Sequence, residues 1–156
     1  MEVSMKRVQI ALNVSNIDKA VEYYSKVFNV QPAKRKSNYV NFVVEEPAMK
    51  LVLIENAQAK ERLNHLGVEL CDTKDVQGAI DHLTEIGLAG RIEENTNCCY
   101  ALQDKVWTQD PDATPWEFYT VLDQNPPPRY SLTSGFGFGS KEGTKENPNC
   151  CQGACS

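Results

Sequence analysis

A strand-like pattern occurs twice in this chain at a fixed separation. Residues 9–13 (QIALN) and residues 65–69 (HLGVE) alternate apolar and other side chains in the same phase, at an offset of 65 − 9 = 56 residues. Alternation with a period of two is typical of a strand that has one apolar face. Two copies of one supersecondary pattern predict a duplicated fold, in which the halves pack against each other.

Each predicted strand is followed by the signals of an amphipathic helix. Residues 15–18 (SNID) have a spacing similar to a capping box, and apolar residues continue at helical spacing from Ala20 to Phe28. Asp72 or Thr73 can cap a second helix, whose apolar positions lie between residues 76 and 86. The helix therefore belongs to the repeated unit.

Further strands follow each helix. Strand-like segments lie around residues 32–35, 39–44 and 50–54 in the first half, and at 90–93, 99–107 and 116–121 in the second half. The sequence thus predicts an α+β fold with two βαβββ modules, at about residues 5–58 and 61–122, within one domain of residues 1–122. Residues 123–156 are rich in Pro and Gly and end in a cysteine cluster, so we expect a flexible tail.

Charge and hydropathy exclude two classes of partner. The net charge of −5 and the pI of about 5.1 argue against nucleic acid. The longest aliphatic run, residues 51–54, is far shorter than the roughly 20 residues of a membrane-spanning helix, and residues 1–9 are polar with no apolar signal core. We therefore expect a cytoplasmic protein. There, the six cysteines stay thiols and do not form the disulfide framework of a small secreted chain.

Three side chains are candidates for a metal site. Strand phase places Gln9 and His65 at equivalent positions on the face away from the helices, and Glu117 in the last strand can join the same concavity. An amide oxygen, an imidazole and a carboxylate suit a divalent first-row metal with open positions. The alternatives are a structural His65 at a strand start and a Glu117 on an edge strand.

The chain resembles the vicinal oxygen chelate superfamily (glyoxalase, bleomycin resistance and dioxygenase proteins) over about residues 5–122. The resemblance lies in the duplicated unit and in the run from Asp110-Pro111-Asp112 to residues 116–119 (WEFY). Residues 7–14, 50–55, 63–69 and 98–107 look like the ArsI/CadI branch, and the last block (CCYALQDKVW) is highly specific.

This resemblance implies an activity and a set of roles. ArsI-type members are Fe(II)-dependent dioxygenases that cleave the carbon–arsenic bond of trivalent organoarsenicals such as methylarsenite and aryl arsenicals, with dioxygen as co-substrate. The metal and the catalysis would belong to Gln9, His65 and Glu117, and the arsenic to Cys98 and Cys99. Glyoxalases carry a further carboxylate in the strand that here reads residues 51–54 (LVLI), and its absence argues against a four-ligand site.

The thiols raise a geometric problem and leave roles open. Adjacent residues of a regular strand point to opposite faces, so we expect a turn or distortion at residues 95–97 to bring Cys98 and Cys99 to one side. Alternatively, one cysteine is simply packed as a small apolar side chain. The tail thiols Cys150, Cys151 and Cys155 are either an auxiliary capture site for arsenicals or part of a dispensable extension.

Two other functions remain open. One is a glyoxalase-like isomerase or thiol transferase, whose metal only polarises an oxygen. The other is a protein that binds cadmium or arsenite through its thiols without catalysis. The sequence is compatible with a monomer or a homodimer, and the presence of both halves in one chain favours pairing of the modules within the chain.

Overall fold

The computed structural model describes residues 6–98 and 100–126. Its elements confirm the predicted α+β class and two βαβββ modules. The first module consists of β1 (Arg7–Val14), α1 (Ile17–Phe28), β2 (Lys34–Arg35), β3 (Tyr39–Val44) and β4 (Met49–Glu55). The second consists of β5 (Leu63–Glu69), α2 (Thr73–Glu85), β6 (Ile92–Cys98), β7 (Ala101–Gln109) and β8 (Pro115–Asp123).

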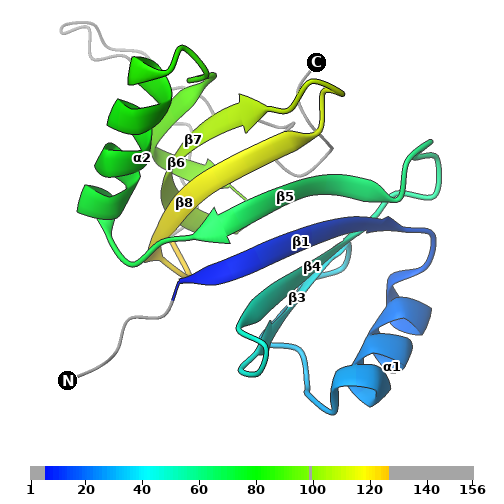
Figure 1. Cartoon of the computed structure of the whole chain (residues 1–156). Helices are drawn as coiled ribbons and strands as arrows, with labels where there is room; N and C mark the ends of the chain where they lie inside the picture. The colour runs from blue at the N-terminus through cyan, green and yellow to red at the C-terminus, as the bar shows by residue number, and fades with distance from the viewer. Residues whose placement is uncertain (1–5, 99, 127–156) are drawn as a thin grey trace, which may run out of the picture.

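All eight strands of the described residues form one sheet in the order β2-β3-β4-β1-β5-β8-β7-β6. The sheet curls into a half-barrel, with β1 and β5 antiparallel at its centre (Figure 1). Gln9 pairs with Gly67, and Ala11 pairs with His65. The offset of 56 residues converts Gln9 into His65 and Ala11 into Gly67, so it converts one pair into the other. The modules are therefore related by a local two-fold axis between β1 and β5.

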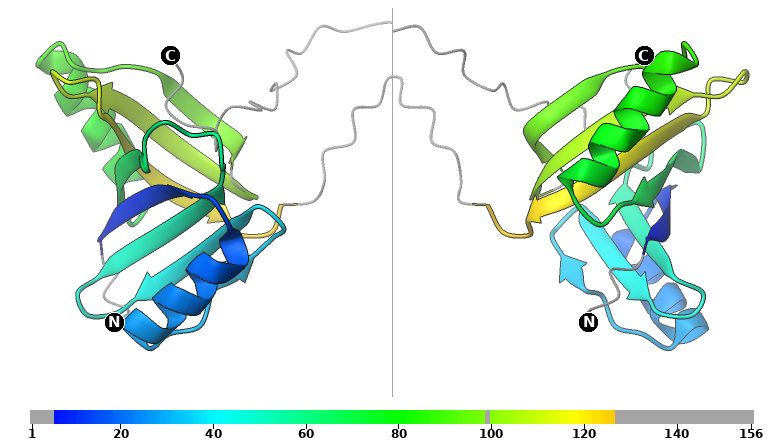
Figure 2. Two further views of the ribbon diagram at one scale, coloured as in Figure 1. Left: turned by 90° about the vertical axis from the view of Figure 1, so that its right-hand side faces the viewer. Right: turned by 60° about the vertical axis from the view of Figure 1, so that its left-hand side comes forward.

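The two helices cover the outer side of the curled sheet (Figure 2). Helix α1 buries Ile17 and Val21 against Val40, Phe42 and Leu53 of the first module. Helix α2 buries Val76 and Leu83 and lies against β7 and β8. Because side chains alternate across a strand, the other face of each strand turns toward the inside of the curl.

Asparagine and aspartate begin the helices as the sequence predicts. The Asn16 side chain accepts a hydrogen bond from the Lys19 backbone N–H at 2.9 Å, and the Asp72 side chain accepts one from Asp75 at 2.9 Å. Asp72, not Thr73, is therefore the cap of α2. Each cap satisfies a backbone donor that the first turn leaves unpaired.

The strands near the cysteines differ from the prediction. The strand expected at residues 90–93 is β6, which extends to Cys98, and the strand expected from residue 99 begins at Ala101. Residues 95–97 lie within β6 and form no turn. The expected distortion is present, because a register shift lies between Glu93 and Thr96 and Asn95 has a φ of 48°.

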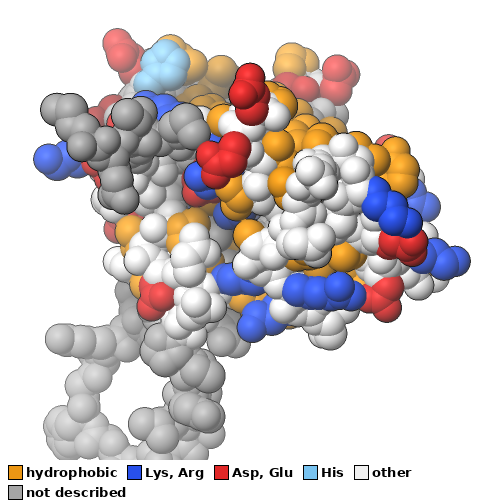
Figure 3. All heavy atoms as spheres, turned by 90° about the horizontal axis from the view of Figure 1, so that it is seen from below, with side chains coloured by type: hydrophobic (Ala, Val, Ile, Leu, Met, Phe, Trp, Pro, Cys, Tyr) orange, Lys and Arg blue, Asp and Glu red, His pale blue; other side chains and the backbone are white. Residues whose placement is uncertain are grey.

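Two features of the described residues bear on partners. None of their helices has the length and apolar character needed to cross a membrane. Lys, Arg, Asp and Glu side chains are interspersed on the face seen in Figure 3, with hydrophobic side chains between them. The tail expected at 123–156 lies outside the described residues from residue 127 onward, including Cys150, Cys151 and Cys155.

Candidate functional site

The structure brings Gln9, His65 and Glu117 together on the concave face. Gln9 Nε2 lies 2.6 Å from Glu117 Oε1 and 3.1 Å from His65 Nε2, and His65 Nε2 lies 3.1 Å from Glu117 Oε1. All three side chains are at most 4% exposed. They come from β1, β5 and β8, which are neighbours in the sheet.

Strand register explains why these side chains meet. Gln9 pairs with Gly67 across β1 and β5, and Gly67 pairs with Glu117 across β5 and β8, so the three residues form one row. A Cβ at Gly67 would lie 3.0 Å from Glu117 Cγ and 3.2 Å from Gln9 Nε2. The missing side chain therefore leaves the space in which the amide and the carboxylate meet.

A buried lysine holds the carboxylate. Lys105, on β7, is 1% exposed, and its Nζ donates a hydrogen bond to Glu117 Oε2 at 2.9 Å. Burial by itself raises the pKa of Glu117, but Lys105 and His65 outweigh burial and hold that pKa well below its usual range. Glu117 is therefore an anion, and Lys105 occupies one oxygen while the other faces Gln9 and His65.

A tyrosine fixes the amide. Tyr119 OH donates to Gln9 Oε1 at 2.5 Å and also lies 3.1 Å from Glu69 Oε2. Burial raises the pKa of Tyr119 well above its usual value, so the phenol stays protonated. If the Gln9 amide turns over, its oxygen faces His65 and Glu117, Tyr119 accepts from the amide nitrogen, and Tyr119 donates to Glu69 instead.

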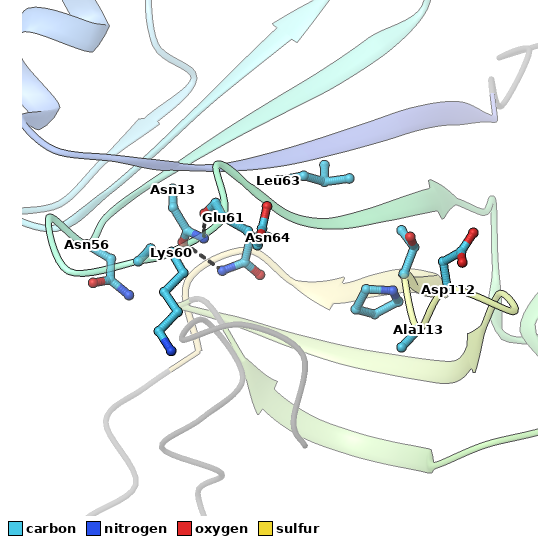
Figure 4. A pocket seen from close by; sticks show the side chains of 11 residues that line it. Asn13, Asn56, Lys60, Glu61, Leu63, Asn64, Asp112 and Ala113 are labelled. Atoms are coloured by element: carbon cyan, nitrogen blue, oxygen red, sulfur yellow. Dashed lines mark hydrogen bonds between the residues drawn. The ribbon is translucent and has the colours of Figure 1, made fainter.

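A chain of amides positions the imidazole. His65 Nδ1 lies 2.7 Å from Asn64 Oδ1, and Asn64 Nδ2 donates to Asn13 Oδ1 at 2.9 Å. Figure 4 shows Asn13 and Asn64 pointing toward each other along the wall of a pocket of about 540 Å³. Trp107 packs its ring against the His65 ring edge to face, at 5.3 Å between centroids. These contacts orient Nε2 toward Gln9 and Glu117.

The donor set fits a divalent first-row metal ion. Ligand atoms at about 2.1 Å from one ion lie about 3 Å from each other, which is close to the distances among the three side chains. Within the described chain, no three His, Cys, Asp and Glu side chains cluster as a metal site. The candidate site thus depends on the amide oxygen of Gln9, after the rotation described above, and three ligands leave further positions open.

The first module lacks a carboxylate at the position equivalent to Glu117. Val52 pairs with Ala11, and Glu117 pairs with Gly67, while Ala11 and Gly67 are themselves related by the offset of 56 residues. Val52 is 3% exposed and packs with Ala11 and Tyr39 on the concave side. The carboxylate that a four-ligand site requires in this strand is therefore replaced by an apolar side chain.

Of the cysteines predicted to bind substrate, the structure describes only Cys98. Cys98 ends β6, pairs with Ala101 and is 3% exposed. It takes part in a disulfide, and its partner sulfur is not in the described residues; Cys99 likewise lies outside them. Tyr100 follows at a φ of 63°, and its ring meets that of Tyr39 at 5.8 Å between centroids. The turn thus includes Tyr100, whereas residues 95–97 carry the distortion within β6.

Sequence reasoning missed the side chains that support the candidate ligands. These residues are Asn64, Gly67, Lys105 and Tyr119. Strand alternation places Lys105 in phase with Gln103 and Trp107 in β7, and that signal was present in the sequence. Its pairing with Glu117 depends on the relation of β7 to β8, which no local pattern shows.

Comparisons with known proteins agree with this architecture. The model of the Glyoxalase/Bleomycin resistance protein/Dioxygenase superfamily matches residues 6–118. A homoprotocatechuate 2,3-dioxygenase from Arthrobacter globiformis superposes with a TM-score of 0.57 at 17% identity, over 76% of this chain and 37% of that chain. A superfamily member from Vibrio splendidus superposes with a TM-score of 0.50 at 13% identity, over 76% and 100% of the two chains. At these identities the likeness shows the fold alone.

Sequence relatives carry two different names. The cadmium-induced protein CadI of Mycobacterium tuberculosis is 50% identical over 118 residues, covering 76% of this chain and 78% of the relative. A trivalent organoarsenical cleaving enzyme of Thermomonospora curvata is 49% identical over 118 residues, covering 75% and 78%. An enzyme of the same name from Bacillus sp. MD1 is 37% identical over 126 residues, covering 78% of each chain. The chain therefore belongs to the glyoxalase/bleomycin resistance protein/dioxygenase superfamily, with relatives of the ArsI and CadI types.

Proposed function

We propose that this protein is an Fe(II)-dependent dioxygenase that cleaves the carbon–arsenic bond of trivalent organoarsenicals and releases arsenite. The observation that carries the proposal is the convergence of Gln9, His65 and Glu117, within 3.1 Å of one another, on the concave face. The organoarsenical cleaving relatives supply the substrate class. Bound Fe(II) would supply a site at which dioxygen is activated.

The residues around the candidate ligands have separate tasks. Lys105 keeps Glu117 anionic and holds one of its oxygens, which leaves the other to the metal. Asn64 and Asn13 hold the His65 ring, and Tyr119 holds the Gln9 amide. A preorganised ligand set of this kind limits the reorganisation that metal binding requires.

The thiols hold the arsenic in this proposal. Trivalent arsenic is a soft, thiol-seeking centre, so Cys98 and Cys99 chelate it while the nitrogen and oxygen ligands hold the harder iron. Chelation needs reduced sulfurs, so the disulfide at Cys98 must open before substrate binds. A reducing cytoplasm suits this requirement. The thiols Cys150, Cys151 and Cys155 then serve as an auxiliary capture site.

The reaction balances for the simplest substrate. Methylarsenite, CH₃As(OH)₂, and one O₂ contain the same atoms as arsenite, As(OH)₃, and formaldehyde. The carbon–arsenic bond breaks, carbon loses four electrons, dioxygen gains them, and arsenic stays trivalent. No additional reductant is needed, so the stoichiometry itself is a test.

The experiment uses the full chain, reduced and loaded with Fe(II) without air. We expect methylarsenite to remain intact under nitrogen, and admission of air to yield arsenite and formaldehyde in a ratio of one each per O₂ consumed. Arsenite yields that do not depend on oxygen would refute the dioxygenase reaction. Oxygen electrode traces and arsenic speciation measure these quantities.

A matched pair of variants tests the ligand assignment. Glu117→Gln keeps the size of the side chain but removes its charge, so we expect Fe(II) affinity and turnover to fall about 100-fold or more. Binding of the arsenical by the thiols remains, because Cys98 lies on a different strand. Glu85→Gln makes the same charge change at an exposed position of α2. Equal turnover in the two variants would show that Glu117 is not a ligand of the metal.

The relation to CadI supports a second candidate, thiol-based binding of cadmium or arsenite without catalysis. Tight binding of either ion by the reduced protein, together with no turnover of methylarsenite, would favour that function. A glyoxalase-like isomerase or transferase is less consistent with Val52 at the position of the missing carboxylate.

A further inference from the structure

A second pocket, of about 270 Å³, carries a local excess of positive charge. Arg7, Lys34, Lys50 and Glu69 are its charged lining residues, so three cations and one carboxylate give a local charge of 3 − 1 = +2. The chain as a whole has a net charge of −5. A positive pocket in an acidic protein points to an anionic ligand.

This pocket lies between the candidate metal ligands and the cysteine-bearing turn. Lys50 of β4 pairs with Gln9 of β1, so it is the immediate neighbour of a candidate ligand on the concave face. Lys34 Nζ donates to the carbonyl oxygen of Tyr100 at 2.8 Å, two residues after Cys98. It also donates to the carbonyl of Gln124. A molecule held at Cys98 and at the metal ligands therefore has this pocket beside it.

The cations in the pocket have spare hydrogen-bonding capacity. Lys50 is only 6% exposed, yet its Nζ approaches Glu69 Oε2 no closer than 3.5 Å, and it lies 5.2 Å from the centre of the Tyr119 ring. Arg7 lies 3.6 Å from Glu69 Oε1. Among the described residues, neither side chain makes a hydrogen bond or ion pair closer than these contacts. A buried ammonium with unmet donors is costly, and an anion in the pocket would satisfy it.

Repulsion between lysine side chains also favours an anion in this pocket. The pKa of Lys34 is lowered, first by burial and then by the nearby charges of Lys50 and Lys36. An anion placed among these side chains would relieve the repulsion. Glu69 limits the choice of anion, because its negative charge lies in the same pocket and opposes a dianion such as phosphate more strongly than a monoanion.

We propose that this pocket binds a carboxylate of the molecule held at the concave site. The organic group of the arsenical carries the carboxylate, since the organic carbon, Cys98 and Cys99 already occupy the bonding positions of trivalent arsenic. The identity of that molecule rests on the proposed function, whereas the anion pocket rests on Arg7, Lys34 and Lys50. The pocket thus favours arsenicals that carry a carboxylate on the organic group over neutral substrates such as methylarsenite.

Binding titrations of the reduced, Fe(II)-loaded protein under nitrogen test the proposal. Phenylarsenite and 4-carboxyphenylarsenite are compared by quenching of tryptophan fluorescence, since Trp107 packs on His65. We expect the carboxylated ligand to bind about tenfold more tightly, as one charge-assisted contact contributes roughly that much. Lys50→Met should abolish this ratio, and Lys26→Met, an equal charge change on the exposed face of α1, should preserve it.

A variant that is expected to increase the ligand preference distinguishes loss of the pocket from misfolding. Glu69→Gln removes the only carboxylate in the charged set of the pocket, so the preference for 4-carboxyphenylarsenite should increase about fivefold over the wild type. A preference that is absent in the wild type, or that survives Lys50→Met, would overturn the proposal. A decrease in Glu69→Gln would do the same.

A further arm separates failure of the pocket from failure of the lyase reaction. Benzoate, which contains no arsenic, should bind saturably and more weakly to Lys50→Met. Benzoate binding without oxygen-dependent arsenite release would refute the proposed reaction and retain the pocket. Absence of both benzoate binding and the preference for 4-carboxyphenylarsenite would refute the pocket.

Discussion

The two modules share a backbone plan but place different chemistry at equivalent positions. Gln9 of β1 corresponds to His65 of β5, and Val52 of β4 corresponds to Glu117 of β8. The second module therefore supplies an imidazole and a carboxylate, while the first supplies one amide. The backbone of the half-barrel is thus symmetric, and different side chains at a few inward positions make the candidate site asymmetric.

The same comparison extends to the surroundings of the site. Gly67 in the second module corresponds to Ala11 in the first, and only the glycine leaves room for two side chains to meet above it. In the first module, Lys50 lies beside Gln9 and faces a positive pocket. One half of the concave face is thus suited to a cation and the other to an anion.

The largest expected effect comes from making the modules more alike. Val52→Glu places a second carboxylate opposite Glu117, and without metal we expect it to lower the free energy of unfolding by about 3 kcal/mol, because the site is buried. Fe(II) or Zn(II) should restore much of this loss and bind more tightly than in the wild type. Urea unfolding with and without metal measures both quantities.

Turnover gives the second readout of this variant. A fourth ligand takes a position that substrate or dioxygen otherwise uses, so oxygen-dependent arsenite release should fall although the metal is bound more tightly. Val52→Gln, of similar size but without charge, is the control for packing. If Val52→Glu binds metal no better than Val52→Gln, the two positions are not functionally equivalent.

An intermediate effect concerns a buried phenol of the first module. Tyr39 is 4% exposed, and burial raises its pKa to about 12. An unfolded tyrosine titrates near pH 10, so the stabilisation is complete below pH 10 and is lost as pH rises from 10 to 12. The free energy of unfolding should fall by roughly 2 to 3 kcal/mol over this pH range, and Tyr39→Phe should remove this pH dependence.

Urea unfolding of Tyr39→Phe and the wild type at pH 8 and at several values between 10 and 12 tests this expectation. Tyr119, the buried phenol of the second module, is present in both proteins, and the charge of an ionised Tyr39 is one cause of its raised pKa. The difference between the two proteins therefore reports Tyr39 together with its coupling to Tyr119. Parallel curves across this range would show that the Tyr39 phenol ionises alike in the folded and unfolded states.

The smallest expected effect on stability comes from filling the space at Gly67. Gly67→Ala puts a Cβ at 3.0 Å from Glu117 Cγ and at 3.2 Å from the Glu117 carbonyl oxygen, so the side chains must shift. We expect a loss of about 1 kcal/mol, since the crowding is partly offset by the lower chain entropy of alanine. Metal affinity should fall about tenfold, because ligand orientation changes.

Ala11→Gly is the matched control, because it makes the reverse change at the equivalent position of the first module. It should cost a similar free energy of unfolding through lost packing and greater chain freedom. Its metal affinity should stay within a few-fold of the wild type. Comparable losses of metal affinity in both variants would show that the row formed by Gln9, Gly67 and Glu117 has no special role.

Much of the fold was predictable because its signals are local. Period-two alternation marked β1 and β5, caps marked the helix starts at Asn16 and Asp72, and the offset of 56 residues marked the duplication. The boundaries of β6 and β7 were less accessible. A register shift at Asn95 and a connection at Tyr100 with positive φ interrupt the regular pattern there.

The candidate site was predictable only in part. Strand phase and family resemblance nominated Gln9, His65 and Glu117, because alternation fixes the face on which a side chain lies. Neither indicated that Lys105 forms an ion pair with Glu117, since this pair joins two strands whose register is set by packing. The positive pocket could not be predicted from sequence patterns either, because Arg7, Lys34 and Lys50 belong to three separate strands.

The sequence by itself determined the order of the elements, their inward and outward faces and the duplication, because each depends on periodicity within a short segment. Only the tertiary structure decided which inward residues meet. Pairing of β1 with β5 and of β5 with β8 put an amide, a glycine and a carboxylate in one row, and a neighbouring strand supplied the lysine. Such contacts follow from long-range register, which local propensity does not encode.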